Sequence, residues 1–203
     1  MKDAVTCANE DRTAANRGGE RGSRASGARR LAYAALCLAL ALALPFLTGQ
    51  IPQIGSMLCP MHIPALLCGF TCGWSWGLAV GLIAPILRSF LFGMPPLYPT
   101  AIAMALELAT YGAVAGLLYA RLPRRGYRVF VALLAAMVAG RVVWGVARLV
   151  LAQVQAQAFT MSMFVAGAIT SAVPGIVLQL ILIPVIVLAL ERAGQTFVGE
   201  ERA

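Results

Sequence analysis

Few ionisable side chains fall within the apolar segments of this sequence, and they are the residues that could do chemistry. They are His62, Arg88, Glu107, Arg141 and Arg148. Ionisable groups are costly inside a membrane, so by default they mark a functional site or a structural ion pair. Three arginines accompany one glutamate, and such a surplus of positive charge suits a ligand that carries a carboxylate or a phosphate.

The spacing of these residues indicates shared helix faces. Residues three, four or seven positions apart lie on one side of a helix, which groups Arg141 with Trp144 and Arg148, and Glu107 with Tyr111. One interpretation is that these faces line a ligand pocket. The other is that Glu107 pairs with one arginine while the other arginines extend toward lipid head groups. The predicted substrate-binding set is His62, Arg88, Tyr98, Glu107, Tyr111, Arg141, Trp144, Arg148 and Gln179.

A metal site is the weaker alternative for His62, the only histidine. The run MLCPMH offers Met57, Cys59, Met61 and His62 as soft donors, which are ligand types that copper or nickel can take. No second histidine or acidic ligand lies nearby in the sequence. We therefore predict neither a metal nor a cofactor.

Enzymatic chemistry has no visible residues to carry it. The sequence contains no GxxxxGK[ST] phosphate loop, and Lys2 is its only lysine, so the chain does not hydrolyse ATP by the P-loop route. HExxH, GxSxG and paired-acid motifs are also missing from it. A membrane transport subunit, not an enzyme, is the predicted class.

The composition defines the elements that must position these side chains. The chain has 203 residues, of which 60% are hydrophobic and 12% charged, whereas soluble domains average about 45–50% apolar and 25% charged residues. At about 20 residues per span, the length holds six transmembrane helices in an all-α integral membrane fold. We predict them near residues 31–47, 60–73, 75–92, 100–120, 129–152 and 174–191, with an outer-side or re-entrant segment at about 159–172.

The arginines predict the topology. Cytoplasmic loops of membrane proteins are enriched in Lys and Arg, and arginines concentrate in residues 1–30 and in the loop with Arg121, Arg124, Arg125 and Arg128. The connections at 49–59, 93–99 and 153–162 contain neither Lys nor Arg. We therefore expect both termini in the cytoplasm: a disordered tail at 1–30, a membrane domain at 31–192 and a second tail at 193–203. The net charge of +8 thus reports topology, not nucleic-acid binding.

A ridge of small residues follows one side of the first predicted helix. Ala35, Ala39 and Ala43 are spaced by four, and small residues at this spacing let another helix approach closely. The five cysteines lie mostly in apolar runs, and we interpret them as small buried hydrophobic residues.

Several segments together resemble the substrate-binding S component of energy-coupling factor (ECF) transporters, the bacterial vitamin importers. The resemblance covers residues 31–192, and the sequence is most similar in character to pantothenate-type and unassigned members. The segments that carry it are MHIP at 61–64, GLAVGLIAPILRSFLFGMPPLYPTAIAMALELATYGAVAGLLY at 77–119, AGRVVWG at 139–145 and VPGIVLQLILIPVIV at 173–187.

The resemblance implies a six-helix fold in a bacterial inner membrane. Its vitamin pocket would face outward, capped by the connection between helices one and two and lined by helices four to six. It also implies partners: a transmembrane T component, which would dock on Ala35, Ala39 and Ala43, and two separate ATPase subunits. Two other classes stay open, namely an autonomous secondary carrier or metal-uptake subunit, and a membrane scaffold without a ligand.

Overall fold

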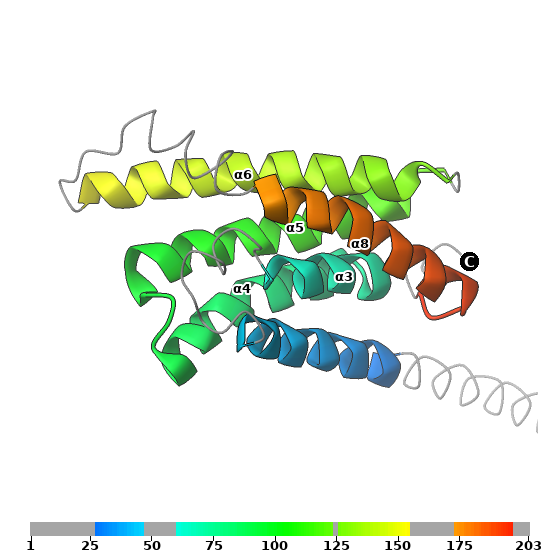
Figure 1. The fold of residues 1–203 in the computed structure, drawn as a ribbon, viewed down its shortest axis with the longest axis horizontal. Helices are drawn as coiled ribbons and strands as arrows, with labels where there is room; N and C mark the ends of the chain where they lie inside the picture. The colour runs from blue at the N-terminus through cyan, green and yellow to red at the C-terminus, as the bar shows by residue number, and fades with distance from the viewer. Residues whose placement is uncertain (1–26, 47–59, 124–125, 155–172, 197–203) are drawn as a thin grey trace, which may run out of the picture.

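The protein is a bundle of antiparallel helices (Figure 1). The structure is a computed structural model that describes residues 27–46, 60–123, 126–154 and 173–196. Within these ranges it contains six α-helices: Gly27–Phe46, α3 (His62–Cys72), α4 (Trp74–Phe92), α5 (Ile102–Arg121), α6 (Arg128–Val154) and α8 (Val173–Arg192). Successive helices run in opposite directions, so α3, α5 and α8 point one way and the other three point back.

Glycines bring α3, α4 and α5 into backbone contact at the centre of the bundle. A Cβ atom added to Gly112 of α5 would lie 2.3 Å from the carbonyl oxygen of Gly77 in α4, and one added to Gly69 of α3 would lie 2.4 Å from the carbonyl oxygen of Gly112. Small residues permit such close helix packing in membranes, where van der Waals contact drives association. These three helices therefore form a tightly packed unit.

Two connections show how the sequence sets the helix ends. Gly73 links α3 directly to α4 at a positive φ of 103°, a conformation that glycine adopts without steric cost. The Pro-rich turn after α4 ends in a short kinked segment, η1 (Leu97–Ala101), in which the backbone of Tyr98 is extended and which leads into α5.

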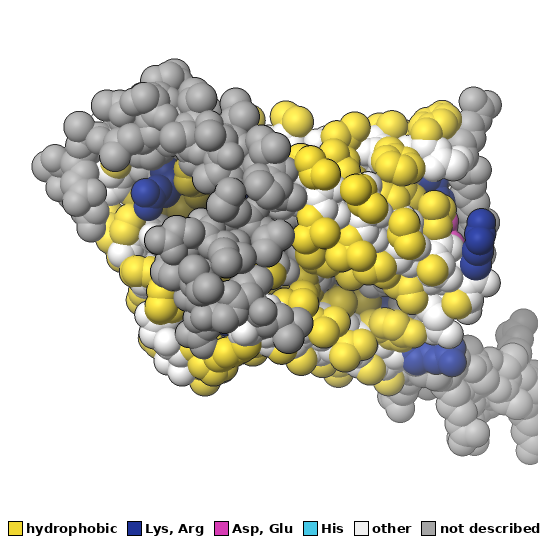
Figure 2. All heavy atoms as spheres, in the orientation of Figure 1, with side chains coloured by type: hydrophobic (Ala, Val, Ile, Leu, Met, Phe, Trp, Pro, Cys, Tyr) yellow, Lys and Arg dark blue, Asp and Glu magenta, His cyan; other side chains and the backbone are white. Residues whose placement is uncertain are grey.

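The outer surface of the bundle is apolar. Figure 2 shows hydrophobic side chains across the middle of one face and basic side chains toward both of its ends. Five of the described helices, all except α3, are long and apolar enough to cross a membrane. Since a bundle with an apolar exterior between polar ends matches the hydrocarbon core of a bilayer, the chain is a multi-pass membrane protein.

One end of the bundle collects the basic helix termini, and we call it the arginine-rich end. Arg30 lies in the first turn of helix Gly27–Phe46. Arg121 ends α5, Arg128 begins α6 and Arg192 ends α8. The first and last described segments also meet there, because the Tyr33 hydroxyl donates a 2.5 Å hydrogen bond to Oε1 of Gln195. Figure 1 shows the start of the first described helix and the end of α8 on this side.

The structure differs from the predicted helices in two places. The first helix begins at Gly27, four residues before the predicted start at Leu31. The second, α3, has 11 residues and is about 16 Å long, which is too short to cross a membrane alone. The predicted start of the last helix near Pro174 is confirmed by Val173–Arg192. The predicted segments at 49–59 and 159–172 lie outside the described residues.

Candidate functional site

The carboxylate of Glu107 is the centre of a buried polar cluster. Its Oε1 atom accepts a 3.1 Å hydrogen bond from the Tyr111 hydroxyl and lies 3.1 Å from Nη1 of Arg141. Nε2 of His62 is 3.5 Å from the same oxygen. The Glu107 side chain is only 2% exposed. Four predicted site residues from three helices are therefore brought together, and we call them the Glu107 cluster.

Local packing explains the geometry of this cluster. Glu107 and Tyr111 are one helical turn apart on α5, so their side chains meet on one face. A Cβ atom added to Gly140 of α6 would lie 2.4 Å from Cε1 of Tyr111. The ring of Tyr111 thus occupies the space that Gly140 leaves open, next to Arg141. Sequence reasoning did not single out Gly140, and its place beside Arg141 in AGRVVWG was the available signal.

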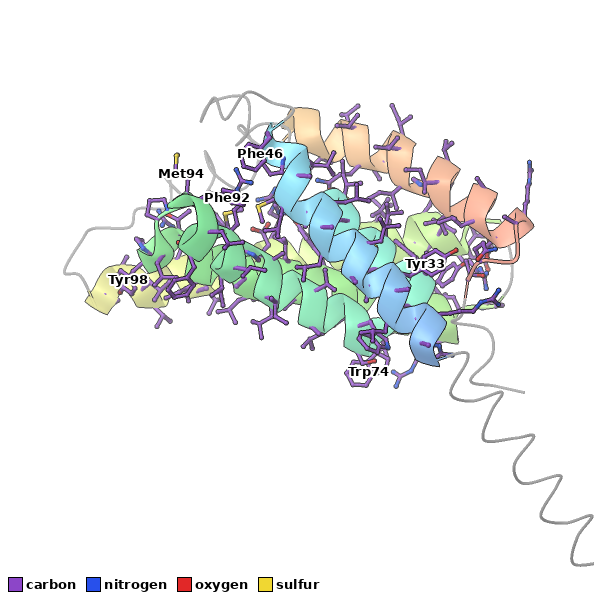
Figure 3. The ribbon with its side chains drawn as sticks, turned by 90° about the horizontal axis from the view of Figure 1, so that it is seen from below. Tyr33, Phe46, Trp74, Phe92, Met94 and Tyr98 are labelled. Carbon is purple, nitrogen blue, oxygen red and sulfur yellow. The ribbon has the colours of Figure 1, made fainter. Side chains whose placement is uncertain are left out.

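Arg88 does not belong to the Glu107 cluster. Its Nη1 atom donates a 2.9 Å hydrogen bond to the carbonyl oxygen of Leu42 near the end of the first described helix. The guanidinium lies 5.1 Å from the ring centroid of Phe46 and 5.6 Å from that of Phe92, and Figure 3 shows these two rings together. Arg88 therefore joins α4 to the first helix by a charge-assisted hydrogen bond and cation–π contacts.

The other predicted residues on α6 lie beyond the cluster. Trp144 and Arg148 are partly buried, one and two turns further along α6 from Arg141. The Tyr98 hydroxyl donates a 2.9 Å hydrogen bond to the carbonyl oxygen of Leu151. Tyr98 thus joins η1 to the last turns of α6, where Figure 3 shows it.

Gln179 is the remaining predicted residue, and it is buried on α8. It lies one turn before Ile183 and two turns before Val187, both of which are fully buried in the main hydrophobic core with residues of α3, α5 and α6. Gln179 therefore faces the interior of the bundle. Its side chain is 2% exposed.

Metal binding has no support in the described part of the chain. No group of three or more His, Cys, Asp or Glu side chains there is arranged to hold a metal ion. Of the soft donors in MLCPMH, Met61 and His62 are described and buried, whereas Met57 and Cys59 lie outside the described residues.

The predicted docking ridge lies on the side of its helix that faces away from the rest of the bundle. Ala35, Ala39 and Ala43 are exposed, whereas Ala34 and Ala41 of the same helix are buried against the bundle. A strip of small side chains is therefore presented to the surroundings.

The fold and this site define a multi-pass membrane protein built around a buried polar cluster. A family model, that of the ECF transporter substrate-specific component, matches residues 29–187. The chain belongs to this family, whose members are subunits of transporters and not enzymes. No curated protein and no solved structure matches the sequence.

Proposed function

We propose that this chain is the substrate-binding subunit of an ATP-driven ECF importer in a bacterial inner membrane, and that it captures a small vitamin or vitamin precursor from outside the cell. The observation that carries the proposal is the Glu107 cluster, a set of polar side chains brought together in the interior of a mostly apolar bundle. Buried polar groups are expensive and persist where they serve a site or a specific pairing. Membership of the family favours the site.

The orientation of the bundle supports capture from outside. Because cytoplasmic segments are enriched in arginine, we place the arginine-rich end in the cytoplasm. Glu107 lies in the second turn of α5, whereas Arg121 ends that helix at the arginine-rich end. The Glu107 cluster is therefore in the outer half of the membrane, and ligand would reach it from the outside.

The proposed substrate is anionic at one end. Glu107 is the only acidic residue between residues 21 and 190, and three arginines accompany it in the middle and outer half of the bundle. Arg148 lies about 10 Å further along α6 than Arg141, toward the outer end of that helix. A ligand that enters from outside would reach Arg148 before Arg141, so we propose that Arg148 meets the anionic group.

Ligand binding by the purified chain tests the proposal. B vitamins and their precursors are screened for an increase in the unfolding temperature, with divalent metal ions as a parallel set. We expect one small anionic compound to stabilise the protein without any partner subunit, because binding to the folded state raises stability by mass action. Stabilisation by a metal ion and by no vitamin-like compound would overturn the proposal.

The Arg148→Met variant tests the anionic end. It should weaken binding of a carboxylate ligand by roughly tenfold, the loss of one charge-assisted hydrogen bond, and leave binding of the methyl ester of that ligand unchanged. Equal losses for the acid and the ester would remove Arg148 from the site.

We propose that the exposed ridge of Ala35, Ala39 and Ala43 docks the T component, to which two ATPase subunits would bind. An Ala39→Leu variant should keep ligand binding and lose co-purification with co-expressed partner subunits, because a larger side chain holds the helices apart. Ala189→Leu is the matched control, since Ala189 is exposed on α8. Unchanged assembly of the Ala39→Leu variant would exclude this docking surface.

A further inference from the structure

Two buried side chains, one in the Glu107 cluster and one on α8, have polar atoms without hydrogen-bond partners among the described residues. They are Nδ1 and Nε2 of His62 and Oε1 of Gln179. The two side chains are 3% and 2% exposed. A buried polar atom left without a partner costs about 1–3 kcal/mol, so each such atom in a folded protein calls for an explanation.

His62 and Gln179 both lie near the level of Glu107 in the bundle. Glu107 of α5 lies 12 residues before Tyr119, Gln179 of α8 lies 12 residues before Glu191, and Tyr119 and Glu191 are hydrogen-bonded to each other. Because α5 and α8 run in the same direction (Figure 1), Gln179 lies near the level of Glu107, and His62 is 3.5 Å from Glu107. The unpartnered atoms therefore come from two helices, α3 and α8, that pack against each other near this level.

The start of α3 adds a preference for hydrogen-bond acceptors. α3 begins at His62, no side chain caps its N-terminus, and Met61, His62 and Ile63 are buried there. The first backbone N–H groups of a helix have no partners within the helix, and its dipole makes this end partly positive. A carbonyl oxygen of a ligand would be stabilised at this position.

The charges nearby argue against a second carboxylate at this depth. The Glu107 carboxyl group pairs with Arg141 and lies 3.5 Å from His62, so a ligand carboxylate here would place a second acidic group beside it in a medium of low polarity. In addition, Oε1 of Gln179 is an acceptor and needs a donor, which an ionised carboxylate does not have.

We propose that this buried end of the site binds a neutral amide-type group, such as an amide, lactam or ureido group. The carbonyl oxygen of that group faces His62 and the start of α3, and its N–H donates to Oε1 of Gln179. The inference rests on the proposed function and names the chemistry of the inner end of the substrate. The anionic end then extends along α6 toward Arg148.

A pair of matched compounds tests this chemistry on the purified full chain. Biotin and lipoate both carry a five-carbon carboxylic acid chain on a sulfur-containing ring, but only biotin has a ureido group. Pantothenate, which contains an amide, and nicotinate, which is a carboxylate without one, form a second comparison. We expect thermal stabilisation by at least one of biotin and pantothenate and by neither lipoate nor nicotinate. Equal stabilisation by lipoate or nicotinate would overturn the inference.

Two variants that remove the unpartnered atoms provide the second test. Gln179→Met and His62→Phe each replace the polar side chain by an apolar one of similar size. They should weaken binding of the stabilising compound by at least tenfold, measured by calorimetric titration. Without ligand, their unfolding temperatures should equal or exceed that of the parent chain, because no hydrogen bond of Gln179 Oε1 or of the His62 ring nitrogens to the described residues is lost. Thr110→Val is the control, since the Thr110 hydroxyl donates to Leu106 on the exposed side of α5.

The outcomes separate this inference from the proposed function. If none of the screened vitamins or precursors binds the parent chain, the proposed function fails and the inference falls with it. If a compound binds and both variants bind it as tightly as the parent does, only the inference fails. Variants that unfold at a lower temperature without ligand would show that the two side chains are structural, which also overturns it.

Discussion

Two clusters of this bundle use the same side-chain types in different surroundings. The Glu107 cluster combines a glutamate and a tyrosine of α5 with an arginine of α6, and it also includes His62 of α3. At the arginine-rich end, Glu191 of α8 accepts hydrogen bonds from Tyr119 of α5 and from Arg128 of α6. Arg128 also donates a 2.8 Å hydrogen bond to the Tyr119 hydroxyl, so the three side chains, which we call the Glu191 cluster, form a closed triangle.

Burial separates the two clusters. The Glu107 side chain is 2% exposed, and next to it lie atoms of His62 that have no partner among the described groups. The Glu191 side chain is 24% exposed, and the Arg128 guanidinium also stacks 4.1 Å from the ring centroid of Tyr119. A partly exposed cluster whose polar groups are hydrogen-bonded to one another suits a structural link between α5, α6 and α8. A buried cluster with polar atoms that lack hydrogen-bond partners suits ligand binding.

The Glu107→Gln variant should give the largest effect. It leaves the Arg141 charge in a largely buried position without its carboxylate, and breaking a buried ion pair in this way costs about 3 kcal/mol. Thermal unfolding in detergent micelles measures the loss. The double variant Glu107→Gln with Arg141→Met should recover most of it, because no unpaired charge is left. A double variant that is less stable than the single one would contradict this description of the pair.

Replacing Gly140 by alanine tests whether packing positions the Glu107 cluster. The added Cβ atom would lie 2.4 Å from the Tyr111 ring, and overpacking of a core costs about 1–3 kcal/mol. The displaced ring should also weaken ligand binding, which calorimetric titration measures. Gly126→Ala is the matched control, because a Cβ atom at Gly126 has nothing within 4 Å. Equal stability of the two variants would show that Tyr111 tolerates the change.

The Glu107 cluster was accessible to sequence reasoning because its members are exceptional in their surroundings. His62, Glu107 and Arg141 are ionisable residues in apolar segments, and a low-dielectric environment brings such groups together. Arg88 met the same criterion, but it contacts the first helix instead. Which neighbour a helix face meets depends on tertiary packing, and the sequence of one helix does not contain that information.

The Glu191 cluster was not predicted, although a signal was present. Tyr119 follows Tyr111 by eight residues, two turns along α5. In the same way, α6 carries a second arginine, Arg128, at its first residue in addition to Arg141. Arg128 was assigned to the arginine-rich loop, and Glu191 stands at the end of the predicted last helix, where charges are common and carry little information about their partners. The helix positions themselves were predictable from hydropathy, except that the shortness of α3 was not.

The Glu191→Gln variant should have the smallest effect on stability. Its ion pair with Arg128 is partly exposed, and pairs of this kind contribute less than about 1 kcal/mol. The neutral amide can still accept hydrogen bonds from Tyr119 and Arg128, so thermal unfolding in detergent should change little. Ligand binding should also stay at the parent level, because the Glu191 cluster lies at the opposite end of the bundle from His62 and Glu107. A loss of stability as large as that of Glu107→Gln would mean that burial does not distinguish the two clusters.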